Sequence, residues 1–154
     1  MEESLITKHA VRKMYHMIDN NNRVSYSAEN NGELLYAPVL KLLHCKIIHR
    51  PTHMSGPPTR WKCLISDGTY FIAAVANDSI KYMFDSRAVR SGTIFLANHF
   101  RIWVTRRDMK VISLYDITPL THGTTDINID DYKDVNIINM SDEVLHEINE
   151  YGTS

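Results

Sequence analysis

The chain of 154 residues has few of the features that mark membrane, secreted or disulfide-rich proteins. Its longest apolar runs, such as residues 70–76, are far too short to span a bilayer, and its N-terminus has no apolar signal-peptide core. The two cysteines, Cys45 and Cys63, lie in apolar, strand-like segments. We interpret them as small buried side chains in a reducing compartment, with a disulfide or a reactive thiol as alternatives. We therefore expect a soluble intracellular protein with no membrane partner.

Sequence motifs for catalysis are also missing. The chain contains no HExxH, CxxC, GxSxG or glycine-rich phosphate loop. His49 and His53 are close enough to suggest a metal pair, but Pro51 lies between them and no third ligand is spaced nearby. We expect a protein that is not an enzyme and that needs neither a metal nor another cofactor.

The net charge of −1 conceals two oppositely charged parts. Residues 38–120 carry 12 Lys and Arg against 5 Asp and Glu, whereas residues 121–154 carry one Lys against 8 acids. A basic body with an acidic tail favours an anionic partner, which is nucleic acid, an acidic peptide or the chain's own tail.

The hydrophobic pattern predicts one mainly β domain over residues 1–120, followed by an acidic flexible linker or tail over 121–154. A helix is expected from Leu5 to Ile18 with Ser4 as its cap, then a polar, Asn-rich insertion over 19–33 that is typical of a loop. Strands are expected over residues 39–48, 60–65, 69–76, 93–105 and 110–120, with a short helix opened by Asn77 or Asp78. This order fits a five-stranded Greek-key barrel of the OB type, although SH3-like and β-grasp folds give similar strand counts.

Alternation along the strands predicts which basic residues face outward. Trp61, Cys63 and Ile65 form an apolar set that faces the core, so Arg60 and Lys62 share the outer face. In the same way Phe100, Ile102 and Val104 face inward, which places Arg101 and Trp103 outside. Arg106 and Arg107, in the following turn, add two cations beside these strands. The alternatives are an ordinary solvated face and a Trp103 that lies in the core, but few carboxylates interrupt these cations.

Several segments carry a resemblance to a known family. They are Ile48-His49-Arg50-Pro51, Gly56-Pro57-Pro58 leading into Arg60-Trp61-Lys62, the hairpin Leu64-Ile65-Ser66-Asp67-Gly68, and Lys110-Val111-Ile112-Ser113-Leu114. Together these resemble the N-terminal OB domain of the large subunit of replication protein A. Three departures are an insertion over 20–32 that is longer than in the family, Arg106-Arg107-Asp108 where a glycine-containing turn is usual, and His99 where an arginine is common.

The resemblance implies a nuclear module whose basic groove binds acidic amphipathic helices of DNA replication, repair and checkpoint proteins, and single-stranded DNA only weakly. Other subunits of replication protein A would bind through parts of the protein outside these residues, and a telomeric or meiotic paralogue is equally compatible. By similarity and by strand alternation, the expected partner-binding residues are Arg50, Arg60, Lys62, Arg101, Trp103, Arg106, Arg107, Lys110 and Val111. The alternative is a single-stranded DNA-binding OB domain of replication or telomere maintenance, which needs stacking aromatics. Trp103 is the best exposed candidate, with Tyr70 or Phe71 as further possibilities.

The acidic tail contains a segment that resembles such a ligand. Ser141 can cap a helix whose first turn holds Asp142 and Glu143, and an apolar stripe follows at Val144, Leu145 and Ile148. We expect either a linker to further domains or an acidic amphipathic helix that docks on the basic body.

Overall fold

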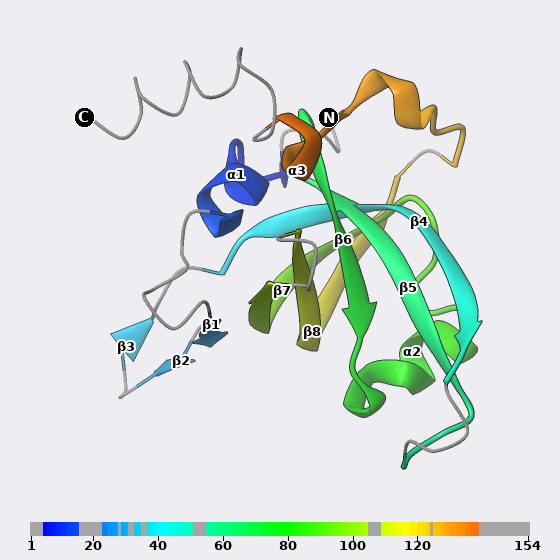
Figure 1. The fold of residues 1–154 in the computed structure, drawn as a ribbon. Helices are drawn as coiled ribbons and strands as arrows, with labels where there is room; N and C mark the ends of the chain where they lie inside the picture. The colour runs from blue at the N-terminus through cyan, green and yellow to red at the C-terminus, as the bar shows by residue number, and fades with distance from the viewer. Residues whose placement is uncertain are drawn as a thin grey trace.

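The computed structural model describes residues 5–15, 23–27, 29–30, 33–34, 37–50, 55–104, 109–123 and 125–138 (Figure 1). Its long strands are β4 (Val39–His49), β5 (Thr59–Ser66), β6 (Tyr70–Ala76), β7 (Thr93–Val104) and β8 (Lys110–His122). Shorter strands are β1 (Arg23–Ser27), β2 (Glu29–Asn30), β3 (Glu33–Leu34) and β9 (Lys133–Asp134). The helices are α1 (Ala10–Tyr15), the 3₁₀ turn η2 (Asp78–Ile80), α2 (Lys81–Asp85), the 3₁₀ turn η3 (Ile129–Asp131) and α3 (Val135–Ile138).

The five long strands close into a barrel. β7, β4, β5, β6 and β8 pair in this order, and β8 pairs again with β7. Every one of these contacts is antiparallel except that between β6 and β8, where Ala74 lies beside Ile112 and Ala76 beside Leu114. The crossover between β6 and β7 carries η2 and α2, which cover one end of the barrel (Figure 1). The predicted mainly β, five-stranded barrel is confirmed, and it is consistent with an OB fold.

Alternate side chains of the strands fill the interior of the barrel, as the sequence predicts. On β6, Ile72 and Ala74 are fully buried, while Ala73 and Val75, which alternate with them, are half-exposed. Cys63, Ile65, Phe100, Ile102 and Ile112 complete the interior from the neighbouring strands. The side chains that alternate with these residues therefore form the outer surface.

The short helix after β6 begins where the sequence predicts. Asn77 accepts a hydrogen bond from the backbone N–H of Ser79 at 3.0 Å, and its own N–H donates to Leu114 O on β8. Ile80 and Phe84 are buried beneath it. The N-cap hydrogen bond and the burial of these two apolar side chains therefore both hold the segment in place.

The N-terminal helix is shorter than predicted. It begins at Ala10 rather than Leu5, because His9 adopts a left-handed φ of 61° and Thr7 pairs with Val39 through both backbone and side chain. Asp67 in the β5–β6 turn accepts the N–H of Val11 at 3.0 Å, which ties the start of the helix to the barrel. Ser4 and residues 16–18 lie outside the described residues.

The Asn-rich insertion contributes a strand, which the sequence analysis did not predict. β1 pairs antiparallel with β7 from Arg23 opposite Trp103 to Ser27 opposite His99. β4 pairs with β7 only as far as Leu96, so this part of the β7 edge needs another backbone partner. The pairing of β1 satisfies it.

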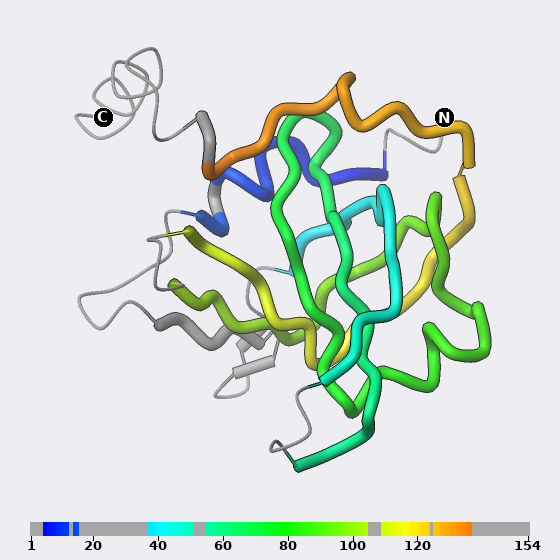
Figure 2. Tube along the Cα trace, turned by 45° about the vertical axis from the view of Figure 1, so that its right-hand side comes forward, coloured from blue at the N-terminus to red at the C-terminus, as the bar shows by residue number. Residues whose placement is uncertain are grey.

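The barrel continues beyond the expected boundary at residue 120. β8 runs to His122, and residues 125–138 then cross the end of the barrel beside the N-terminal segment (Figure 2). β9 pairs with β6, and Val135 is 1% exposed within the core. This first part of the acidic segment is therefore packed on the body rather than forming a linker. Among the described residues, no helix has the length and apolar character needed to cross a membrane.

Candidate functional site

A row of outward side chains crosses four adjacent strands. Lys62 on β5 lies opposite Val75 on β6, Val75 lies beside Ser113 on β8, and Ser113 lies opposite Arg101 on β7. Trp103 and Val111 form the neighbouring pair on β7 and β8. We call this surface the cationic face and define it as Arg60, Lys62, Val75, Val111, Ser113, Arg101 and Trp103. It brings together five of the predicted site residues, which are Arg60, Lys62, Arg101, Trp103 and Val111.

The β7–β8 side of the cationic face is an aromatic stack built around one guanidinium. Cζ of Arg101 lies 5.1 Å from the ring centroid of Trp103 and 5.6 Å from that of Tyr115. The ring of His99 stacks on Tyr115 at 5.0 Å with an interplanar angle of 28°. Cation–π contacts of this kind hold the long Arg101 side chain in place while it keeps its charge.

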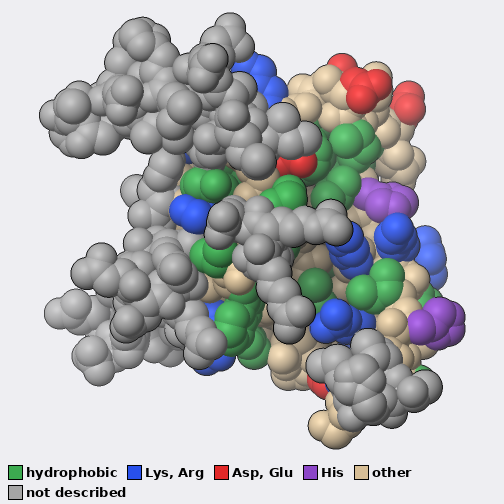
Figure 3. Space-filling view, in the orientation of Figure 1, with side chains coloured by type: hydrophobic (Ala, Val, Ile, Leu, Met, Phe, Trp, Pro, Cys, Tyr) green, Lys and Arg blue, Asp and Glu red, His purple; other side chains and the backbone are tan. Residues whose placement is uncertain are grey.

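The β5 side carries more charge than the sequence analysis predicted. Lys46 on β4 lies opposite Lys62, and Ile48 lies opposite Arg60. Figure 3 shows Lys, Arg and His side chains gathered over β4 and β5, with hydrophobic side chains between them. Within the described part of the chain, Nε of Arg60 is buried and has no hydrogen-bond partner.

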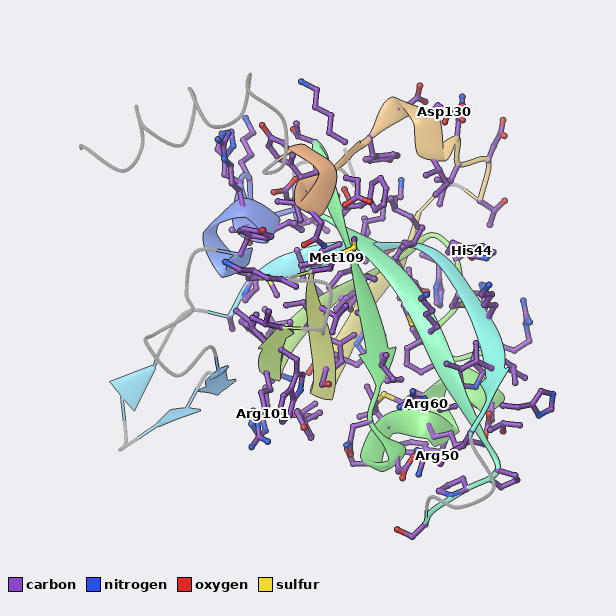
Figure 4. All side chains as sticks on the ribbon, in the orientation of Figure 1. His44, Arg50, Arg60, Arg101, Met109 and Asp130 are labelled. Atoms are coloured by element: carbon purple, nitrogen blue, oxygen red, sulfur yellow. The ribbon has the colours of Figure 1, made fainter. Side chains whose placement is uncertain are left out.

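Arg50 is bound within the protein rather than displayed on this face. Its guanidinium forms a two-point ion pair with Asp78, at 2.8 and 3.2 Å, and also donates to Ser55 O at 2.8 Å. The side chain is only 12% exposed. Figure 4 places Arg50 next to α2. Arg50 therefore joins the β4–β5 loop to the start of η2, and its charge is neutralised by Asp78.

Lys110 is also committed to an internal contact. Its Nζ donates to Tyr15 O at the end of α1, at 2.7 Å, and lies 3.8 Å from the centre of the Tyr15 ring. Burial lowers the pKa of this ammonium group. Lys110 thus stabilises the C-terminal end of α1 rather than offering its charge to a partner.

Some predicted elements lie outside the described residues. These are Arg106 and Arg107 in the turn between β7 and β8, and the acidic segment 141–151. Of the two further stacking candidates, Tyr70 is 6% exposed and lies in the core, whereas Phe71 is half-exposed.

Sequence reasoning missed the residues that join the two sides. Tyr115 and Ser113 follow from alternation once Ile112 and Leu114 are placed inward, so the signal for them was present. Val75 and Lys46 could be assigned to this surface only once the pairing of the strands was known, because alternation within one strand does not show which strands are neighbours. His99 was noted only as a missing arginine, and the structure instead shows it in the aromatic stack.

The two cysteines lie directly opposite each other on β4 and β5 as free thiols. Burial raises the pKa of both thiols, and most strongly that of Cys63. Both are therefore protonated at neutral pH, which agrees with the role of small core side chains. Among the described residues, no group of three or more His, Cys, Asp or Glu side chains is arranged to hold a metal ion.

No protein-family model matches this chain, and no curated protein matches it at a significant level.

Proposed function

We propose that this protein is an interaction module, not an enzyme, that recruits acidic amphipathic segments of proteins acting in DNA replication and repair, in the nucleus. The observation that carries the proposal is the cross-strand row in which Lys62 and Arg101 flank the uncharged residues Val75 and Ser113. The process and compartment rest on the resemblance to the N-terminal OB domain of the replication protein A large subunit.

The spacing of this row suits a helix. Three strand-to-strand steps of about 4.8 Å separate Lys62 from Arg101, a path of about 14 Å that follows the curved outer surface of the barrel. A helix with its side chains is about 10–12 Å wide. An amphipathic helix lying between the two cations therefore contacts Val75 and Val111 with its apolar stripe and reaches both cations with flanking carboxylates.

The energetics predict a moderate, salt-sensitive affinity. Exposed ion pairs contribute only about 0.2–1 kcal/mol each, so the apolar contacts must supply much of the binding free energy. The Debye length shrinks from about 10 Å at 0.1 M salt to about 3 Å at 1 M, so added salt weakens the charged contacts selectively.

A titration with one acidic peptide tests the proposal. The probe is a synthetic peptide with the sequence of residues 141–151, which carries acids beside an apolar stripe. We expect Lys62→Glu and Arg101→Glu each to weaken binding by about tenfold, a change equal to about 1.4 kcal/mol. Lys133→Glu is the matched control, because Lys133 is an exposed lysine on β9 away from the cationic face. If all three variants lost affinity equally, the effect would come from net charge alone and a defined binding site would be refuted.

A second candidate function is binding of single-stranded DNA, and the stack around Arg101 favours it. Alternating aromatic rings and a guanidinium offer π-faces on which bases stack, at about 1–3 kcal/mol per base. The same titration with a thymine oligonucleotide at physiological salt separates the two functions. Tighter binding of the oligonucleotide than of the peptide, lost in Tyr115→Ala, would make DNA the preferred partner.

A further inference from the structure

Among the described residues, one edge of β4 is open along its second half. β4 pairs with β7 only from Val39 to Lys41, whereas its pairing with β5 continues to His49. In the described part of the chain, no strand lies on the β7 side of β4 beyond Lys41. Open edges of this kind present unpaired backbone donors and acceptors to other chains.

The register identifies which backbone groups point outward from this edge. The N–H of Arg50 donates to Pro58 O on the β5 side at 2.8 Å. Because backbone groups alternate direction along an antiparallel strand, Ile48 and Lys46 also pair toward β5. The N–H and C=O groups of Ile47 and His49 therefore point toward the open edge. The side chain of Ile47 is 50% exposed, and His49 is exposed as well.

The surroundings of this edge are cationic. The turn after α2 lies along its first part, since Gly92 N–H donates to Leu42 O at 2.7 Å and Ser91 hydrogen-bonds the thiol of Cys45. Arg87 and Arg90 of this turn are exposed, and Arg87 acts electrostatically on Cys45. The one carboxylate of α2, Asp85, is already bonded to Lys81 and to Trp61.

We propose that the edge at Ile47–His49 binds an extended acidic segment of a partner protein by strand addition, as a site separate from the cationic face. Main-chain hydrogen bonds to Ile47 and His49 give the register, and the apolar Ile47 side chain takes an apolar residue. The arginines of the 86–91 turn select carboxylates. They also disfavour pairing between two copies of this chain, because the same cations of both copies would then lie close together.

Hydrogen exchange on the full chain tests the site directly. The probe is a blocked hexapeptide in which glutamate and valine alternate, a pattern that favours an extended conformation with acids on one face. We expect the peptide to slow exchange at the amides of Ile47 and His49 and to leave Ile48 unchanged, because Ile48 already pairs with β5. Absence of protection at both edge amides overturns the proposal.

Three variants separate this site from the cationic face. Ile47→Pro removes an outward N–H and is expected to weaken peptide binding by about tenfold, while Arg90→Glu weakens it by removing a flanking cation. Arg101→Glu, on β7, is expected to leave the protection of the Ile47 and His49 amides by this peptide unchanged. Equal loss of that protection in Arg101→Glu would overturn a separate site, as would a dimer of the full chain that disappears in Ile47→Pro. Should Ile47→Pro not fold, the exchange measurement on the unaltered chain decides.

Discussion

Removal of the Asn136 side chain provides a quantitative test of the role of the acidic segment in the fold. The amide of Asn136 is held against the first residue of β8, where its Oδ1 accepts the N–H of Lys110 at 2.7 Å and its Nδ2 donates to Lys110 O at 2.9 Å. Asn136 is only 4% exposed. It therefore takes the place of a neighbouring strand for this residue, at the point where the turn between β7 and β8 ends.

The expected cost follows from these two bonds. Asn136→Ala leaves one donor and one acceptor of Lys110 without their partner, and each such loss costs about 1–3 kcal/mol when the group is buried. Lys110 is half-buried, so water restores part of the loss. We expect the free energy of unfolding to fall by about 2–4 kcal/mol, a large fraction of the stability of a small domain.

Urea unfolding followed by far-ultraviolet circular dichroism measures this change. Asn98→Ala is the matched control, because Asn98 makes a surface bond between side chains, to Thr118 at 2.8 Å. Its loss is expected to cost at most about 0.5 kcal/mol. A value for Asn136→Ala as small as that for Asn98→Ala would show that residues 125–138 do not contribute to the fold as we infer.

Two further predictions concern the end of the barrel near α2. Gly56→Ala is expected to destabilise the protein by about 1–3 kcal/mol in the same assay, because Gly56 has a φ of 111° and a Cβ there would overlap the Arg50 guanidinium. An unchanged midpoint of urea unfolding would contradict the contact between Gly56 and Arg50. The hydrogen bonds that Asp85 accepts, first from Lys81 and then from Trp61, lower the pKa of its carboxyl group. The ionised carboxylate therefore stabilises the fold at pH values above the ordinary carboxyl pKa of about 4. This stabilisation is lost as the pH falls through the lower pKa that Asp85 has in the folded protein. Asp85→Asn should therefore flatten the acid side of the stability profile, and an unaltered profile would refute the coupling.

The strand alternation was sufficient to predict much of the cationic face. Arg60 and Lys62 alternate with a buried Cys63, and Arg101 and Trp103 alternate with a buried Ile102, so their outward direction was determined locally. Arg50 and Lys110 could not be assigned in this way. Their guanidinium and ammonium groups are bound by Asp78 and by the carbonyl of Tyr15, at sequence separations of 28 and 95 residues.

The amino-acid composition of residues 121–138 gave no indication that this segment packs on the barrel. Asp126, Asp130 and Asp131 suggest a solvated linker, and all three are indeed exposed. The segment is attached by the backbone pairing of β9 with β6 and, among the described residues, by the buried side chains of Val135 and Asn136. Two buried side chains give no periodic signal. The Asn-rich insertion was misjudged for a related reason, since β1 forms because β7 offers it an open edge.

The sequence by itself determined the class of fold, the five barrel strands, the short helix after β6 and the separation of basic body from acidic tail, because these depend on local periodicity and composition. The tertiary structure decided which cations remain available to a partner. It placed Lys62 and Arg101 in one row through Val75 and Ser113, which come from strands far apart in the chain. It also neutralised Arg50, buried Lys110 against α1 and, within the described ranges, left one edge of β4 without a neighbouring strand. Ion pairing and strand closure are set by residues that meet only when the barrel forms.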